Sequence, residues 1–146
     1  MLPYREWSTD TKFFYWGFVV LIGLLIVGAV NAAMGAEPAL HPTFQAMIDA
    51  TNAERRARGY APLVADPQLQ AMAEKWGKHM ATTWRFEHSN YPVAENIAAG
   101  QRTVPEAMAS WMKSSGHRAN ILGGYSRIGC AAYKMGGKCY WVQCFK

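Results

Sequence analysis

One continuous apolar run stands out from an otherwise amphipathic chain. Residues 13–30 read FFYWGFVVLIGLLIVGAV and contain no charged side chain. As a helix, this run covers about 27 Å, which is close to the hydrocarbon thickness of a bilayer. The pattern therefore predicts a single transmembrane helix, Phe13–Val30.

Two amphipathic patterns follow and predict helices. Phe44, Met47 and Ile48 lie at helical spacing upstream of Gly59, a residue suited to a helix C-terminal cap. Asp66 followed by Pro67 predicts the start of a second helix, because Asp accepts hydrogen bonds from the first turn and proline needs no partner there. The apolar stripe of this second helix is assigned to the core and comprises Leu69, Met72, Ala73, Trp76 and Met80.

The last third of the chain predicts a shorter helix and then a β-hairpin. Thr103 and Glu106 have the spacing of a capping box, and the helix that they open runs to about residue 114. Arg127–Lys134 and Lys138–Phe145 are β-prone runs around a turn at residues 135–137. Helices that come first and strands that come later predict the α+β class, with helices covering a small antiparallel sheet.

The charges that flank the apolar run predict its orientation. Arg5 and Lys12 precede it, and the next basic residue is Arg55. Positive residues near a span are retained in the cytoplasm, so residues 1–12 are expected inside and the domain, residues 43–146, outside in a periplasmic or extracellular space. The predicted location is a membrane crossed once.

A cleavable signal peptide is the competing interpretation of the apolar run. Small residues between Asn31 and Ala36 offer cleavage sites, and residues 31–42 read as a linker rich in Ala, Gly and Pro. However, eighteen apolar residues exceed the usual length of a signal core, and the segment before them carries Glu6 and Asp10. An uncleaved signal anchor is therefore the favoured interpretation.

The exported part of the chain carries the whole net charge. The formal charge is +5, and the two basic and two acidic residues before position 31 cancel. A basic domain is attracted to anionic lipid or to a cell-wall polymer, although a soluble surface can also be basic without such a partner. Nucleic acid is not expected as a partner, because the compartment is wrong and no run of Lys and Arg is present.

Three cysteines lie in the predicted hairpin, which fits an oxidising compartment. If the turn is centred near Gly137, Cys130 and Cys144 face each other across the strands, which predicts a disulfide between them. Cys139 is then left over, either as a buried thiol or as a link to a second copy or another subunit.

Several short motifs occur in a fixed order over the exported domain. They are Asn52-Ala53-Glu54-Arg55-Arg56, His88-Ser89, Glu95-Asn96-Ile97-Ala98, Ser114-Ser115-Gly116-His117-Arg118-Ala119-Asn120-Ile121-Leu122 and the terminal Tyr140-Trp141-Val142-Gln143-Cys144-Phe145. Together they resemble the CAP superfamily of cysteine-rich secretory proteins, antigen 5 and plant pathogenesis-related proteins, and especially its bacterial branch. The resemblance implies a three-layer α-β-α sandwich.

The resemblance implies a cleft, and it transfers His88 and Glu95 to that cleft. Ser89 and Asn96 adjoin them in the motifs, and His117 belongs to the bacterial motif and reaches the cleft from another direction. The family's second acidic residue is replaced here by Ser114, and the segment that carries its second histidine is absent. The chain therefore lacks the full set of two histidines and two acids.

Two roles are open for these cleft residues. His88, His117 and Glu95 supply the minimum for an open site that binds a divalent metal such as zinc. Alternatively, His88 hydrogen-bonds Glu95 to pin a loop, and His117 buttresses the segment after Gly116. Asn96 and Asn120 can likewise serve to tie down loop backbone.

The sequence supports three functions in descending order, and the first two assign no catalytic residue. The first is a binding module whose cleft holds a lipid, a glycan or a peptide. The second is an accessory subunit of a membrane complex, with the helix Phe13–Val30 packed on partner helices. The third is a metal-assisted hydrolase of peptide or wall polymer, with Glu95 as the base. A serine enzyme is disfavoured because no Gly-x-Ser-x-Gly elbow exists, and a cysteine enzyme because all three cysteines lie in the hairpin.

Overall fold

The computed structural model of the chain describes residues 41–146. The predicted transmembrane helix, the cytoplasmic residues 1–12 and nearly all of the predicted linker lie outside the described residues. Within residues 41–146, no helix combines the length and the apolar character that crossing a membrane requires.

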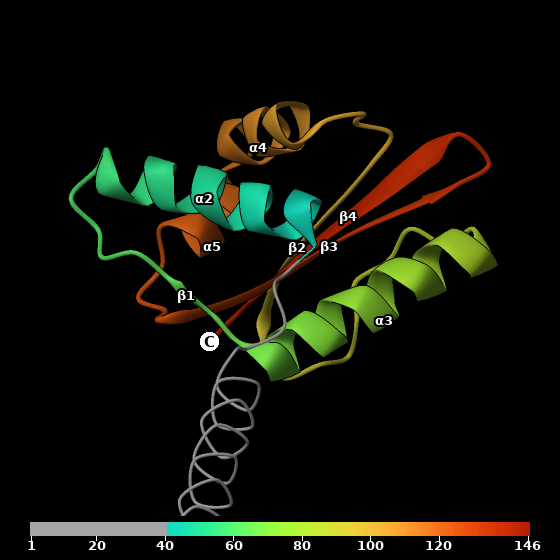
Figure 1. Cartoon of the computed structure of the whole chain (residues 1–146), viewed down its shortest axis with the longest axis horizontal. Coiled ribbons are helices and arrows are strands. Elements are labelled where there is room, and N and C mark those ends of the chain that lie inside the picture. Colours follow the sequence, from blue (N-terminus) through green and yellow to red (C-terminus); the bar gives the residue numbers. More distant parts are fainter. Residues whose placement is uncertain (1–40) are drawn as a thin grey trace, which may run out of the picture. The chain divides into compact units, whose positions relative to one another are not determined.

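The described residues form a four-stranded sheet with helices on both faces (Figure 1). Helices α2, α4 and α5 cover one face, which we call the upper face, and α3 covers the other, the lower face. The predicted three-layer α-β-α arrangement is confirmed. The elements in chain order are α2 (Pro42–Arg56), β1 (Val64–Ala65), α3 (Pro67–Thr83), β2 (Ala94–Ala99), α4 (Val104–Lys113), α5 (Ser115–Ile121), β3 (Arg127–Met135) and β4 (Lys138–Phe145).

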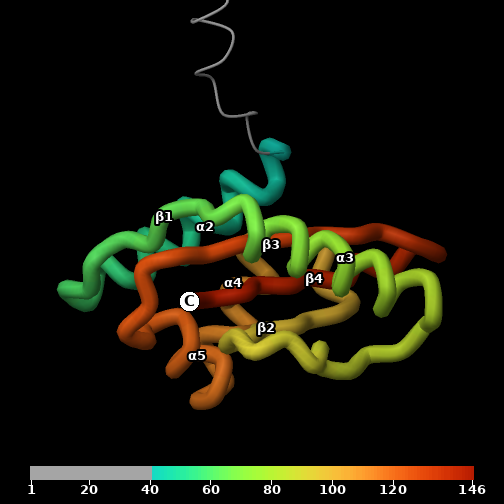
Figure 2. Tube along the Cα trace, turned by 90° about the horizontal axis from the view of Figure 1, so that it is seen from below, coloured from blue at the N-terminus to red at the C-terminus, as the bar shows by residue number. Residues whose placement is uncertain are grey.

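The strand order is β1-β3-β4-β2, so the hairpin β3–β4 forms the centre of the sheet (Figure 2). The hairpin is as the sequence predicts, and its turn residues Gly136 and Gly137 have φ angles of +55° and +77°, which favour glycine. β2 pairs antiparallel with β4, but β1 pairs parallel with β3. The sheet is therefore mixed and not purely antiparallel, because a long connection through three helices separates β1 from β3.

The register of the hairpin contradicts the predicted disulfide. Cys130 lies opposite Gln143, and Cys144 lies opposite Gly129. Because side chains alternate between faces along a strand, this shift of one residue sends the Cys130 thiol to the upper face and the Cys144 thiol to the lower face. Both are free thiols, as is the half-buried Cys139.

Local signals in the sequence set the starts of two helices. The Asp66 carboxylate accepts from the N–H groups of Gln68 and Leu69 at 2.9 and 3.0 Å, as expected of an N-cap. Thr103 Oγ1 accepts from the N–H of Glu106 at 3.3 Å, as the capping box predicts. The predicted first and third helices are also present, with ends within one to three residues of expectation.

Two elements differ from the interpretation of the sequence. Ala94–Ala99, for which the sequence pattern predicts no element, is strand β2, and the motif from Ser115 to Ile121 is helix α5. The segment AENIAA has little intrinsic preference for a strand, so its conformation comes from pairing with β4.

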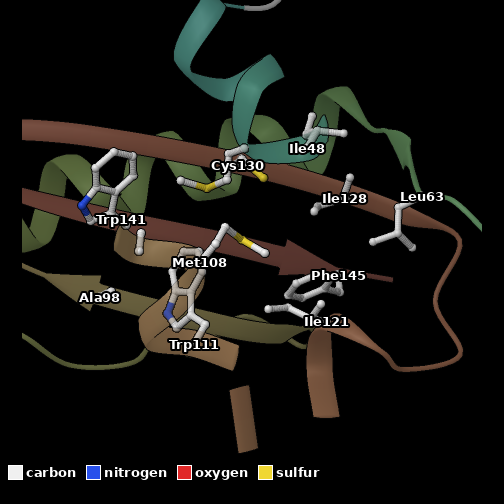
Figure 3. Close-up of a cluster of buried hydrophobic side chains, with 12 residues drawn as sticks. Ile48, Leu63, Ala98, Met108, Trp111, Ile121, Ile128, Cys130, Trp141 and Phe145 are labelled. Atoms are coloured by element: carbon white, nitrogen blue, oxygen red, sulfur yellow. The ribbon is translucent and has the colours of Figure 1, made fainter. Parts of the chain in front are cut away.

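Each face of the sheet has its own apolar core. On the upper face, Trp111 and Met108 of α4 and Ile121 of α5 pack toward Trp141 and Phe145 of β4 (Figure 3). The lower core comprises Leu69, Ala73, Met80 and Ala81 of α3 with Ile97, Ala131, Tyr140, Val142 and Cys144 of the strands. The predicted stripe of α3 is confirmed as core, although Met72 and Trp76 are only partly buried.

Arg55, near the end of α2, has a structural role. The residue is only 2% exposed. Its guanidinium donates to the carbonyl groups of Ala61, Ile121 and Gly123 at 2.7 to 2.8 Å. Arg55 thereby ties α2 to the loop that leads from α5 into β3.

Gly129 allows α3 to pack closely on β3, which generates a prediction. A Cβ atom at this position would overlap the backbone of Leu69 and Gln70. We expect Gly129→Ala to lower the free energy of unfolding by about 3 kcal/mol. Gly116→Ala is the matched control, because a Cβ there meets open space and alanine favours the helix α5. Urea denaturation of both variants checks this; equal stabilities would contradict the close packing.

Candidate functional site

The site lies on β2, the edge strand that carries the motif from Glu95 to Ala98. Glu95 lies opposite Cys144 and Asn96 lies opposite Gln143 on the central strand. Successive side chains of a strand point to opposite faces, so Glu95 faces the layer of α3 and Asn96 faces the layer of α4 and α5. The two motif residues therefore lie on opposite faces of the sheet, toward different helices.

The carboxylate of Glu95 is buried but has an exposed partner. Its side chain is 5% exposed, whereas that of His88 is 59% exposed. Glu95 Oε1 accepts from the backbone N–H of Ser89 at 3.0 Å and lies 2.8 Å from Nδ1 of His88. The hydrogen bond between His88 and Glu95, one of the two predicted roles, is confirmed. Within residues 41–146, Glu95 Oε2 is buried and has no hydrogen-bond partner.

Trp76 of α3 holds the segment that presents His88. Its indole N–H donates to the carbonyl of Glu87 at 2.9 Å, and its ring meets that of Tyr91 edge-on with 6.2 Å between centroids. The His79 ring stacks on the indole with 4.5 Å between centroids. Aromatic side chains thus hold the residues on both sides of His88 in the chain.

Asn96 is fully buried and joins β2 to α5. Its side-chain N–H groups donate to the carbonyl of His117 and to Oε1 of Gln143, both at 3.1 Å. Asn120 donates to Oδ1 of Asn96 at 2.9 Å and to the carbonyl of Glu95 at 3.2 Å. These amides were predicted to tie down loop backbone. They do bond backbone carbonyl groups, but they join strand β2 to helix α5 and not parts of a loop.

The network continues across the upper core to α2. Gln143 Nε2 donates to Oγ1 of Thr51 at 2.8 Å, and Thr51 in turn donates to the carbonyl of Met47. Thr51, Asn96 and Gln143 are all inaccessible to solvent. Thr51 and Gln143 were not predicted as members of the site. Alternation along β4 places Gln143 on the same face as Trp141 and Phe145, which is a signal that the sequence does carry.

His117 lies near His88 but makes no metal site with it. Burial lowers the pKa of His117, and the nearby His88 lowers it further, so the imidazole is mostly neutral at pH 7. In the described residues, no three His, Cys, Asp or Glu side chains are grouped so that they could hold a metal ion. The proposed ligand set of His88, His117 and Glu95 therefore does not fit zinc.

Cys144 shares the lower face with Glu95. Burial, and then the neighbouring carboxylate, raise the pKa of the Cys144 thiol to about 12. Burial also raises the pKa of Cys130 well above its usual value. Both thiols stay protonated at neutral pH and are poor nucleophiles.

The motif order, the sandwich and the His88–Glu95 pair agree with a match to a known family. The family model described as the cysteine-rich secretory protein family, CAP, matches residues 48–145. The chain belongs to the CAP family. The curated relatives include an uncharacterized protein, YkwD, of Bacillus subtilis, which is 31% identical over 79% of this chain and 51% of its own length.

Plant and bacterial proteins share this CAP domain. The pathogenesis-related protein PRMS of Zea mays is 30% identical over 71% of this chain and 65% of its own length. The chain thus spans about half to two thirds of these curated relatives.

Solved structures share the fold at lower identity. An outer surface protein from Borrelia burgdorferi has a TM-score of 0.67 at 15% identity, covering 77% of this chain and 97% of its own. An extracellular protein with an SCP domain from Bacillus anthracis has a TM-score of 0.64 at 24% identity, covering 75% of this chain and 44% of its own. These likenesses support the α+β sandwich.

The nearby His88 ring generates a prediction about the pKa of His117. His88→Gln removes a titratable ring that lowers the pKa of His117, so we expect the pKa of His117 to rise. The rise should be smaller than the remaining effect of burial, which is the larger cause. Titration of the imidazole C–H signals by NMR measures it. An unchanged His117 pKa would show that the two rings do not share one cleft.

The buried network predicts a stability cost at Asn96. Asn96→Val leaves the amide of Asn120 and Oε1 of Gln143 without this partner, and we expect a loss of about 3 kcal/mol in the free energy of unfolding. Asn90→Val, at a loop position outside the network, is the matched control and should change it by less than about 0.5 kcal/mol. Chemical denaturation compares the variants, and a small loss at Asn96 would rule out a structural network.

Proposed function

We propose that this CAP domain is a non-catalytic binding module, held in the periplasmic or extracellular space by an uncleaved anchor at residues 13–30. Its ligand lies in the cleft around His88, Glu95 and His117. The observation that carries the proposal is Glu95 Oε2, a carboxylate oxygen that is buried and has no partner in the described residues. A buried acceptor of this kind costs free energy unless a donor satisfies it, and a ligand hydroxyl or amide N–H supplies such a donor when the exposed segment around His88 shifts to admit it.

The neighbours of Glu95 favour a glycan among the ligand classes that the sequence suggested. Sugar rings carry many hydroxyl donors, and N-acetylated sugars also carry an amide N–H. The exposed His88 imidazole offers a second polar contact, and the half-buried ring of Tyr91 offers an apolar surface against which a sugar can pack. The positive charge of the domain suits an acidic wall polymer.

The anchor rests on hydropathy and flanking charge. Eighteen apolar residues, with Arg5 and Lys12 close before them and no Lys or Arg after them until Arg55, support a single span with the domain outside. The intact mass of the protein from native membranes tests this part. We expect the mass of the uncut chain, whereas a mass that lacks roughly the first 33 to 36 residues would establish a cleaved signal peptide instead.

A conservative substitution tests the cleft. Glu95→Gln keeps the size of the side chain and can keep the bond from Ser89, but it places an amide donor where Oε2 accepts. Using the full chain in mild detergent and isolated peptidoglycan sacculi as the probe, we expect Glu95→Gln to weaken binding about tenfold, as loss of a charged hydrogen bond does. Glu87→Gln is the matched control, because it removes the same charge from the exposed loop nearby.

Co-sedimentation with sacculi measures these affinities. If the wild-type chain does not bind sacculi, or if Glu95→Gln binds them equally well, the proposal that the cleft around Glu95 binds a glycan is wrong. Vesicles of phosphatidylglycerol serve as a second probe. Their binding should be the same for both variants, since it would depend on the basic surface rather than on Oε2.

A further inference from the structure

The two edges of the sheet differ in how their backbone groups are satisfied. On β2, the outward carbonyl of Glu95 accepts from Asn120 at 3.2 Å, and that of Ile97 accepts from the indole of Trp111 at 3.0 Å. Side chains of α4 and α5 therefore cover this edge. Covered edges are the usual protection against the addition of another strand.

The opposite edge, along β3, is covered over only part of its length. β1 pairs with Arg127 and Ile128 alone. At Cys130, the side-chain amide of Gln70 takes the place of a neighbouring strand: its Oε1 accepts from the Cys130 N–H at 3.0 Å, and its Nε2 donates to the Cys130 carbonyl at 2.6 Å. This edge thus already accepts a peptide-like group, and that group comes from α3.

Beyond Cys130, the same edge is open. Backbone groups point to the same side at every second residue of a strand, so those of Ala132 and Lys134 point outward as those of Cys130 do. The tight turn leads to the same assignment. The residues of its closing pair, Met135 and Lys138, bond to each other, so the backbone groups of Lys134 and Ala132 point away from β4. In residues 41–146, no hydrogen bond reaches these outward groups of Ala132 and Lys134.

A groove runs beside this open stretch. It encloses about 590 Å³, and it lies between the start of α2 and the outer face of α3. Figure 2 shows β3 at this side of the sheet, with α3 along it and the start of α2 beyond it. The lining residues are Phe44 from α2, Ala71, Glu74, Lys75 and Lys78 from α3, and Ala131, Ala132 and Tyr133 from β3.

The charges at the groove are mostly positive. Lys75 and Lys78 line it and are exposed, and Lys134 is exposed on the strand itself. The acidic lining residue Glu74 accepts from Gln70 at 2.9 Å, which engages its carboxylate. An occupant with carboxylates is therefore favoured over a basic one.

We propose that the open edge of β3 binds an extended, acidic peptide segment of a partner protein as an added strand. Its backbone pairs with the N–H and C=O groups of Ala132 and Lys134, its apolar side chains enter the groove, and its carboxylates pair with Lys75 and Lys78. Addition of a strand gives affinity through backbone bonds and specificity through alternate side chains. This site lies at the opposite edge of the sheet from His88 and does not depend on the glycan cleft.

Proline at the open edge gives a sharp test. Ala132→Pro removes an outward N–H that no residue of the described chain uses, so the ladder between β3 and β4 stays intact. The probe is a blocked octapeptide of alternating Glu and Val, added to the isotope-labelled full chain in mild detergent. In the wild type, we expect exchange of the amide protons of Ala132 and Lys134 to slow at least about tenfold. In Ala132→Pro, we expect the Kd to rise at least about tenfold.

Charge variants keep the test decisive if the proline variant does not fold. Lys75→Glu with Lys78→Glu should also raise the Kd at least about tenfold, whereas Lys113→Glu, an exposed change on α4, should not. Unchanged amide exchange with the peptide, or equal binding of an alternating Lys and Val peptide, overturns the proposal. So does a dimer that Ala132→Pro converts to a monomer, because the occupant is then a second copy.

Discussion

The pairing of β2 with β4 is the constraint on which the rest of the site depends. It fixes which motif residue faces which layer: Glu95 is directed toward α3 and Asn96 toward α4 and α5. A slip of one residue would exchange them, burying a carboxylate in the amide network and removing the partner of His88. The register in turn rests on Gln143, whose side chain bonds Asn96 on one side and Thr51 on the other.

Local chemistry in the sequence predicts much of this fold. Asp66 and Thr103 act through their immediate neighbours, so the predicted starts of their helices were correct. Gly136 and Gly137 form the turn of the predicted hairpin. β2 was missed because the segment AENIAA forms a strand only where β4 is available to pair with it. The disulfide failed for a similar reason: placing the turn half a residue too far along reverses the face of every partner. The bond of His88 to Glu95 was predicted, but the buried state of Oε2 depends on the folded layers.

The sheet places two contrasting surfaces at its two edges. At β2, polar side chains from three elements converge on a single strand and leave one buried acceptor beside an exposed imidazole. At β3, Gln70 covers one residue, and the next two outward residues lie open beside a positively charged groove. The proposed ligand cleft and the proposed peptide site therefore lie on β2 and β3, with the central strand β4 between them.

The central claim is that the unpartnered oxygen of Glu95 accepts a hydrogen bond from a ligand. A crystal structure of the full chain with a bound glycan fragment of peptidoglycan measures this directly. The account predicts a hydroxyl or amide donor of the sugar within about 3 Å of Oε2, with the His88 bond to Oε1 retained. A fragment bound elsewhere, with Oε2 still without a partner, would contradict it.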